Sequence, residues 1–261
     1  MIQPAAIPGT IALHALMSTQ LLSGKSALVT GGARRSGRAI ALALANAGAD
    51  VAITYRTSQP EALQTAREIE SMGCHALAVE CDVRSEGSVR RAIDATVSQF
   101  GRLDIVVNNA AVFEAAPLGT ISLDQWDAVF ETNARGPFLV AREALAHLRA
   151  VHGRIVNIGS LGGLHAWAGH GHYCASKAAL HMLTQAMAKA FAPEVSVNCV
   201  APGWIETGEG PAAESDRFAA KTPMRRNGTV EEVAGAVLFF TTGPAFVTGQ
   251  ILAVDGGLGL T

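Results

Sequence analysis

Two side chains with complementary acid–base chemistry, Tyr173 and Lys177, lie four residues apart in the sequence. On a helix this spacing places both side chains on one face. A free tyrosine has a pKa of about 10, so its phenol is a poor proton shuttle at neutral pH. A nearby ammonium group stabilises the phenolate and lowers that pKa. The pair therefore predicts proton transfer by Tyr173, tuned by the charge of Lys177.

Ser160, thirteen residues before Tyr173, adds a hydroxyl group that could hydrogen-bond a substrate oxygen. Reduction of a carbonyl by hydride leaves an alkoxide, which needs a proton and a group that stabilises its developing charge. A Tyr-x-x-x-Lys sequence alone is common by chance. The elements that position these three residues therefore decide how much weight the pattern carries.

Short runs of Val, Ile and Ala alternate with helical patterns along the chain, and Gly48 and Gly73 stand where two of the helices should end. The expected strands are residues 26–29, 51–55, 76–80, 105–107, 154–158, 196–200 and 250–254. The expected helices are residues 38–47, 61–72, 88–100, 123–149, 173–192 and 230–241. We predict an α/β fold, a single-domain Rossmann-like doubly wound parallel sheet with helices on both faces.

Ligands of such sheets bind at the carboxyl ends of the strands, so residues directly after a strand are functional candidates. The first expected strand is followed by a glycine-bearing turn that leads into a helix. Backbone N–H groups of such a turn can approach a pyrophosphate at the helix N-terminus. The candidate cofactor-binding residues in this turn are Gly31, Arg34, Arg35, Ser36 and Gly37.

The end of the second strand indicates which dinucleotide binds. Sites for NAD(H) place an acidic residue there, about 20 residues after the turn, to hold the ribose 2′-hydroxyl. This strand instead ends in Tyr-Arg-Thr-Ser, and Asp50 lies at its opposite end. Arg56 and Ser58, together with Arg34, suit a 2′-phosphate, which an acid would repel. NADP(H) is therefore the expected cofactor.

The order of these motifs resembles the short-chain dehydrogenase/reductase family. The family's TGxxxGxG turn corresponds to residues 30–37, with Arg35 in place of the middle glycine, and pteridine reductases within the family resemble this variant. The family's catalytic Asn–Ser–Tyr–Lys arrangement corresponds to Asn133, Ser160, Tyr173 and Lys177. The resemblance runs from about Ser26 to the C-terminus and includes residues 108–111, 202–207 and 255–257.

The resemblance implies roles for further residues. Asn133 is expected to hold a water that relays protons to Lys177, and Lys177 to bind the nicotinamide ribose. Further cofactor contacts are expected from Asp82, Val83, Asn109, Ala110, Tyr173, Pro202, Gly203, Ile205 and Thr207. A substrate pocket with aromatic walls is expected from Phe113, Leu161, Leu164, His165, Trp167, His170 and Trp204. A homotetramer, formed partly through the C-terminal strand, is also implied.

Residues 204–222 are expected to form a mobile lid over the substrate, because Gly208, Gly210 and Pro211 argue against a rigid element. Residues 23–261 are expected to form a single dinucleotide-binding catalytic domain. Residues 1–22 are expected to be an N-terminal extension, which reads poorly as a signal peptide because it lacks a basic start. Because Met17 stands just before the first strand pattern, residues 1–16 are expected to be either flexible or a misassigned start.

Composition limits the kinds of binding partner and the cellular location that we expect. The 261 residues are 49% hydrophobic and 16% charged, which allows one sizeable core. The net charge of −2 and the lack of a run of about 18 apolar residues argue against nucleic-acid and membrane partners. The four cysteines lack metal-ligand spacing, and His170 and His172 lack a third ligand, so we expect reduced thiols, a cytoplasmic location and no metal.

The leading hypothesis is an NADP(H)-dependent oxidoreductase that reduces the carbonyl of a small-molecule substrate or oxidises the matching alcohol, with Tyr173 as proton donor or acceptor. One alternative is pteridine-reductase-like reduction of a C=N bond, which Arg35 favours, although pteridine reductases of that type carry an aspartate where Ser160 stands. A second is a 3-oxoacyl-thioester reductase. A third is a non-catalytic NADP(H)-sensing binding protein, which would be expected to lose the Tyr/Lys pair.

Overall fold

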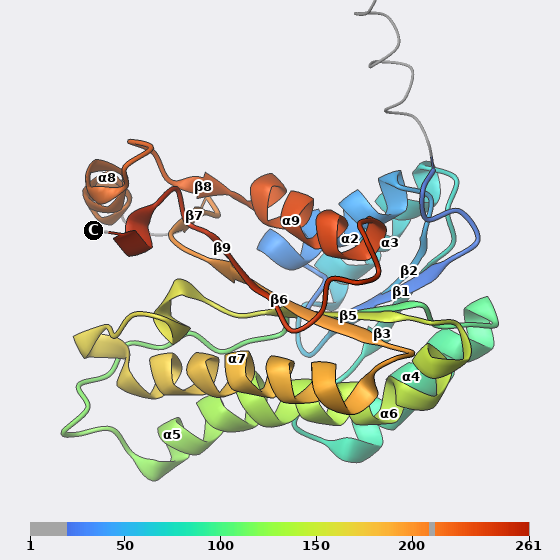
Figure 1. Cartoon of the computed structure of the whole chain (residues 1–261), viewed down its shortest axis with the longest axis horizontal. Helices are drawn as coiled ribbons and strands as arrows, with labels where there is room; N and C mark the ends of the chain where they lie inside the picture. Colours follow the sequence, from blue (N-terminus) through green and yellow to red (C-terminus); the bar gives the residue numbers. More distant parts are fainter. Residues whose placement is uncertain (1–19, 209–211, 261) are drawn as a thin grey trace, which may run out of the picture.

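The computed structural model describes residues 20–208 and 212–260, and its centre is a seven-stranded parallel sheet (Figure 1). The strands are β1 (Ser26–Val29), β2 (Asp50–Tyr55), β3 (Ala76–Glu80), β4 (Ile105–Asn108), β5 (Arg154–Ile158), β6 (Ser196–Pro202) and β9 (Ile251–Val254). Their order is β3-β2-β1-β4-β5-β6-β9, and neighbouring strands pair in parallel. The order reverses between β1 and β4, which is the switch point where doubly wound sheets bind ligands.

Helices cover both faces of the sheet (Figure 1). On one face lie α2 (Arg35–Asn46), α3 (Gln59–Ser71) and α9 (Val230–Thr242), and on the other lie α4 (Glu86–Phe100), α6 (Gly136–Ala150) and α7 (Gly171–Phe191). Each face has its own apolar core, with Ile40 and Val237 in the first and Val140 and Leu148 in the second. The predicted fold class is confirmed.

Glycines end the first two helices, as the sequence predicts. Gly48 and Gly73 follow the last residues of α2 and α3 with φ values of +96° and +86°. This left-handed conformation costs glycine little, and it turns the chain back toward the sheet. The start of β2 therefore lies beside β1, which places the carboxyl ends of both strands at the same edge.

The long helix predicted for residues 123–149 is divided into three segments. They are α5 (Leu123–Phe130), a π-helical turn over Glu131–Arg135, and α6. Such single π-turns are frequent at functional sites, because the extra residue redirects the side chains around it. Here the turn contains Asn133, one of the predicted catalytic residues.

The expectation that residues 204–222 lack a rigid element is wrong in part. Residues 212–221 form helix α8 (Ala212–Lys221), and β7 (Ile205–Glu206) pairs with β8 (Gly228–Thr229). Four of the ten residues of α8 are alanine, which favours helix, and the ring of Phe218 stacks on Trp204 with 4.2 Å between centroids. Gly210 and Pro211 lie outside the described residues, and Gly208 precedes the helix.

The packed part of the chain begins before residue 23. Leu22, at the end of the expected N-terminal extension, is buried in the core between the sheet and α2, and its N–H donates to the carbonyl oxygen of Ala47 at 2.8 Å. Residues 1–19 of that extension lie outside the described residues. All four cysteines are free. No helix in the described ranges is long and apolar enough to span a bilayer, and no group of three potential metal ligands occurs there.

Candidate active site

The turn between β1 and α2 brings segments of backbone close together. Gly31 has a φ of +63°, and a methyl group added to Gly37 would collide with the carbonyl oxygen of Gly31. Arg35, which stands in place of the middle glycine of the family's turn, has a φ of +50°, a left-handed conformation that strains a residue with a side chain. The first turn of α2, which is fully described, has no acidic side chain, so the positive end of the helix dipole can favour an anion.

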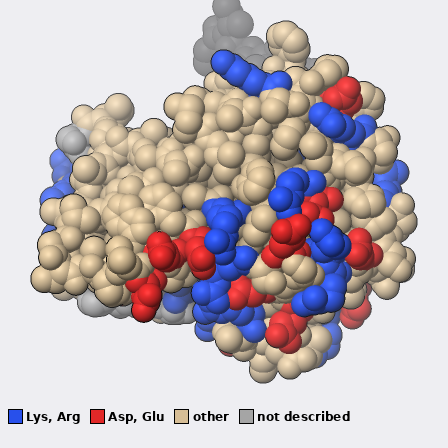
Figure 2. Space-filling view, turned by 90° about the horizontal axis from the view of Figure 1, so that it is seen from below, with Lys and Arg blue, Asp and Glu red and all other residues tan. Residues whose placement is uncertain are grey.

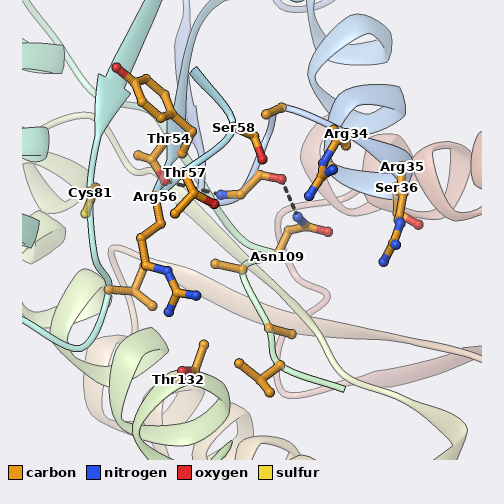
Figure 3. Close-up of a pocket in the computed structure, with 18 of the residues that line it drawn as sticks. Arg34, Arg35, Ser36, Thr54, Arg56, Thr57, Ser58, Cys81, Asn109 and Thr132 are labelled. Atoms are coloured by element: carbon orange, nitrogen blue, oxygen red, sulfur yellow. Dashed lines mark hydrogen bonds between the residues drawn. The ribbon is translucent and has the colours of Figure 1, made fainter. Parts of the chain in front are cut away.

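This turn forms one wall of a cavity of about 360 Å³ (Figure 3). The predicted cofactor residues that line it are Gly31, Arg34, Arg35, Ser36, Gly37, Arg56, Ser58, Asp82, Val83, Asn109, Ala110 and Thr207. The remaining ones, Tyr173, Lys177, Pro202, Gly203 and Ile205, are not part of that lining. Sequence reasoning missed Thr54, Thr57 and Thr132, because a threonine in these segments carries no signal of its own. Arg34 and Arg35 lie on one side of the cavity and Arg56 on the other (Figure 3).

Asn109 holds the turn in place. Its side-chain amide donates to the carbonyl oxygens of Thr30 and Gly31, both at 3.0 Å, and its backbone N–H donates to Oγ1 of Thr30 at 3.0 Å. The segment after β4 is therefore joined to the segment after β1. This interaction gives Asn109 a positioning role in the cavity wall.

Asp82 is fixed by a residue that the sequence did not single out. Arg84 donates to both carboxylate oxygens of Asp82, with Nη2 at 2.6 Å from Oδ2 and Nε at 3.0 Å from Oδ1. These hydrogen bonds, together with the more distant charge of Arg56, hold the pKa of Asp82 below its usual value. Asp82 therefore lines the cavity as a carboxylate whose orientation is fixed by Arg84.

Tyr173, Lys177 and Ser160 meet beyond β5, and all three are largely buried. The Nζ atom of Lys177 donates to the carbonyl oxygen of Ile158 at 2.7 Å and lies 5.8 Å from the centre of the Tyr173 ring. Ser160 hydrogen-bonds the Tyr173 side chain. The predicted grouping of hydroxyl, phenol and ammonium is thus present in space.

Burial dominates the ionisation of the pair. It raises the pKa of Tyr173 to about 12, although the hydrogen bond from Ser160 acts in the opposite direction. It also lowers the pKa of Lys177 to about 8. The lowered tyrosine pKa expected from the sequence is therefore not found, because the loss of hydration on burial outweighs the hydrogen bond with Ser160. At neutral pH Tyr173 is a neutral phenol, able to donate a proton.

Asn133 is fully buried in the π-helical turn and connects two parts of the site. Its Oδ1 atom accepts from the N–H of Val112 at 2.8 Å, while its Nδ2 atom donates to the carbonyl oxygen of Val112 at 2.9 Å and to Oγ of Ser176 at 3.1 Å. Ser176 directly precedes Lys177 on α7. Asn133 therefore fixes the segment after β4 against α7, and its predicted water contact stays a prediction.

Aromatic rings surround the Tyr173 phenol. Phe113 meets it edge-on with 4.8 Å between centroids, and Trp167 lies nearly parallel to it at 6.2 Å. His170 stacks on Phe113 with 4.7 Å between centroids, within 10° of parallel. Phe113 is 58% exposed, so one face of this aromatic cluster, Phe113, Trp167 and His170, is open to a ligand.

The other predicted substrate residues lie farther along the site. Trp204 is stacked on Phe218 of α8, a partner that sequence reasoning missed although Phe218 is the one large apolar residue of that helix. Leu161 and His165 pack near Gly259, where an added methyl group would come within 2.9 Å of Leu161 and 3.0 Å of His165. The C-terminal turn therefore borders the loop that follows Ser160.

Known proteins resemble the chain over most of its length. Residues 31–259 match a family model described as enoyl-(acyl carrier protein) reductase. A 3-oxoacyl-[acyl-carrier-protein] reductase of Synechocystis is 37% identical over 241 residues, which cover 91% of this chain and 98% of that protein.

Two solved structures are similar in sequence and in fold. One is a short chain dehydrogenase from Burkholderia cenocepacia in complex with NADP, with 40% identity, a TM-score of 0.86, and coverage of 91% of this chain and 98% of that one. The other is a blue fluorescent protein from a metagenomic library in complex with NADPH, with 39% identity, a TM-score of 0.86 and the same coverage.

Proposed function

The chain belongs to the short-chain dehydrogenase/reductase family and is an oxidoreductase; from this premise we propose that it reduces a carbonyl with NADPH, or oxidises the matching alcohol with NADP⁺. The observation that carries the proposal is the buried grouping of Ser160, Tyr173 and Lys177 at the carboxyl end of the sheet. It combines a proton donor, a hydrogen-bond donor for an oxyanion and a cation beside one another.

The residues of the cavity fit NADP(H). The close approach of Gly31 and Gly37 leaves backbone where a pyrophosphate would lie, at the positive end of α2. Arg56, Ser58 and Arg34 would hold the 2′-phosphate, and residues 55–58 contain no acid to repel it. Lys177 would bind the nicotinamide ribose. When bound, the cofactor supplies or accepts the hydride. Relatives solved with NADP and NADPH support this assignment.

The side chains of this site would handle the proton and the developing charge. In the reducing direction the substrate oxygen gains negative charge, and the Oγ–H of Ser160 donates a hydrogen bond to it. The Oη–H of Tyr173 then transfers its proton to that oxygen and leaves a phenolate. Lys177 stabilises the phenolate by its charge, and the hydrogen-bonded segment around Asn133 keeps α7 in place. Reduction requires Tyr173 in its protonated form, which its raised pKa favours.

The surroundings of Tyr173 favour a carbonyl compound that is uncharged near its reactive carbon. Residues 160–172 contain no Lys, Arg, Asp or Glu, and residues 112–122 contain only Glu114. Burial and the neighbouring His172 lower the pKa of His170, which favours its neutral form. An anionic group next to the carbonyl would therefore find no cation in these segments. The open aromatic cluster supports a ketone that carries a planar ring, such as an aryl ketone or a quinone.

A 3-oxoacyl thioester is the second candidate substrate, because a relative with 37% identity bears the name 3-oxoacyl-[acyl-carrier-protein] reductase. Its keto group is also uncharged, so the catalytic residues accept both classes. Ser160, which is hydrogen-bonded to Tyr173, supports a carbonyl over the pterin alternative. The retained Tyr173 and Lys177 support an enzyme over a sensor.

The Phe113→Ala variant separates the two substrate classes. We expect its KM for an aryl ketone or quinone to rise about tenfold, because a stacked ring pair contributes roughly 0.5–1.5 kcal/mol beyond burial. The KM for a short 3-oxoacyl thioester and the KM for NADPH should change little, because neither ligand needs this ring. Initial rates of NADPH oxidation over both substrate classes measure the effect. An equal loss for both classes would contradict the ring preference.

A homo-oligomer, with a tetramer as the form that the family resemblance implies, is the proposed assembly. Figure 2 looks onto α5, α6 and α7 and shows a broad area without charged side chains beside a cluster of both signs. Large apolar side chains are exposed on these helices, including Leu123 at 80%, Met182 at 65% and Phe138 at 41%. Burying them against a second copy would remove this apolar surface from water.

Light scattering coupled to size exclusion should give a mass of about four chains of 27.0 kDa. Met182→Glu should shift that mass downward, because it places a charge among the exposed apolar side chains of these helices. The matched change Arg149→Glu, on the charged side of α6, should leave the mass unchanged. A single-chain mass for the wild-type protein would contradict the proposed assembly.

A further inference from the structure

His181 is a buried histidine that the proposed mechanism does not use. It lies on α7, and Tyr173, Lys177 and His181 follow one another at intervals of four residues, so all three project from one face of the helix. His181 is only 4% exposed. A polar ring in this position, one turn beyond Lys177, needs a partner to offset its loss of hydration.

The loop that carries Ser160 wraps around this ring. A methyl group added to Gly159 would collide with Nε2 of His181, and one added to Gly163 would lie 2.6 Å from Cε1 and 2.9 Å from Nδ1. The imidazole therefore fits between two glycines, one on each side of Ser160. Any larger residue at either position would displace the ring or the loop.

One hydrogen bond joins the ring to the backbone of Ser160. The N–H of Ser160 donates to Nε2 of His181 at 3.4 Å, which requires that the ring be neutral with its proton on Nδ1. Burial and the charge of Lys177 lower the pKa of His181 to about 4, so the neutral form prevails at physiological pH. Lys177 on the same helix is the charged side chain that acts on it, and Sγ of Cys199 on β6 approaches Gly159 beside the ring.

The segment around Ser160 is thus held to α7 at two consecutive points. Lys177 binds the carbonyl oxygen of Ile158 at 2.7 Å, and His181 binds the N–H of Ser160. The Oγ atom of Ser160 accepts from the N–H of Gly162 at 3.0 Å and hydrogen-bonds Tyr173. A shift of the Ser160 backbone would therefore move its hydroxyl relative to a phenol that is itself fixed on α7.

We propose that His181 is a positioning residue, which sets the Ser160 hydroxyl against the Tyr173 phenol by accepting the Ser160 N–H and by filling the space between Gly159 and Gly163. The inference rests on the proposed function, because it needs Ser160 and Tyr173 to act on a substrate. It extends the site from four residues to a fifth that touches neither substrate nor cofactor.

Three substitutions test the role. His181→Gln keeps an acceptor near the position of Nε2, so its kcat should stay within about tenfold of wild type. His181→Leu keeps volume without an acceptor, and His181→Asn is polar but too short to reach Ser160. Both should lose about 100-fold in kcat, the effect of a misplaced reacting group. The KM for NADPH should not change in any of them.

A double-mutant cycle separates positioning from general structural damage. If His181 acts through the Ser160 hydroxyl, His181→Leu should cost less than about threefold in a Ser160→Ala background, where that hydroxyl is gone. A full 100-fold loss in that background would overturn the inference. Thermal unfolding and NADPH fluorescence establish that each variant is folded, and the Asn and Gln pair decides the matter if the Leu variant does not fold. If Ser160→Ala and Tyr173→Phe alone keep full activity, the proposed function fails instead.

Discussion

Replacement of Tyr173 by phenylalanine is expected to lower kcat for carbonyl reduction by about 100- to 10,000-fold, the contribution of a positioned general acid. The variant removes one oxygen and leaves the ring, so the packing against Phe113 and Trp167 is kept. NADPH should bind with unchanged affinity, because the arginines and glycines of the cavity are untouched. Single-turnover oxidation of NADPH measures the chemical step, and fluorescence of the bound cofactor measures affinity.

The pH dependence of the wild-type enzyme supplies an internal control. Because its pKa is raised to about 12, Tyr173 keeps its proton at neutral pH and remains available there as the proton donor for reduction. Lys177, whose pKa is lowered to about 8, loses its charge above that pH, so the reduction rate should fall as the pH rises above this value. In the alcohol-oxidising direction the wild-type enzyme needs Tyr173 as a phenolate, so its rate depends on the ionisation of this side chain. The residual activity of Tyr173→Phe should lack that pH dependence. Wild-type kcat in Tyr173→Phe would remove Tyr173 from the mechanism.

The fold could be predicted because its signals are local. Strands buried on both faces read as continuous apolar runs, and glycines such as Gly48 mark helix ends by their left-handed backbone. The turn around Gly31 and Gly37 is equally local, since close approach of backbone to backbone excludes any side chain. These features leave their mark within a few residues of sequence, so composition and spacing suffice to find them, although Asn109 completes the turn from a distant segment.

The parts that sequence reasoning missed depend on distant neighbours. The raised pKa of Tyr173 comes from burial by several segments, which no four-residue motif records. Arg84 is important only because it hydrogen-bonds Asp82 at the cavity wall, a contact that the sequence does not reveal. Helix α8 is stabilised by the stacking of Phe218 on Trp204, fourteen residues away, and His181 acquires a role only because Gly159 and Gly163 close around it.

Replacement of Arg56 by aspartate is expected to change cofactor preference more than any other single substitution in the cavity. A charge-assisted hydrogen bond contributes about 1.5–3 kcal/mol, so its loss alone should lower kcat/KM for NADPH by about 10- to 100-fold. The new carboxylate would repel the 2′-phosphate and could accept from the 2′-hydroxyl of NADH. Arg56 is exposed at the end of β2, so the free energy of unfolding should change little.

Three comparisons make the Arg56→Asp result interpretable. Arg56→Lys retains the charge and should keep most of the preference for NADPH, although a single ammonium lacks the paired donors of a guanidinium. Arg67→Asp, on the exposed face of α3 away from the cavity lining, alters net charge equally and should leave the ratio of the two cofactors unchanged. Added salt should raise the KM for NADPH in the wild type more than in Arg56→Asp, because an exposed ion pair is screened. If NADPH remains as effective as before in Arg56→Asp, the 2′-phosphate is held elsewhere, and Arg34 becomes the next residue to replace.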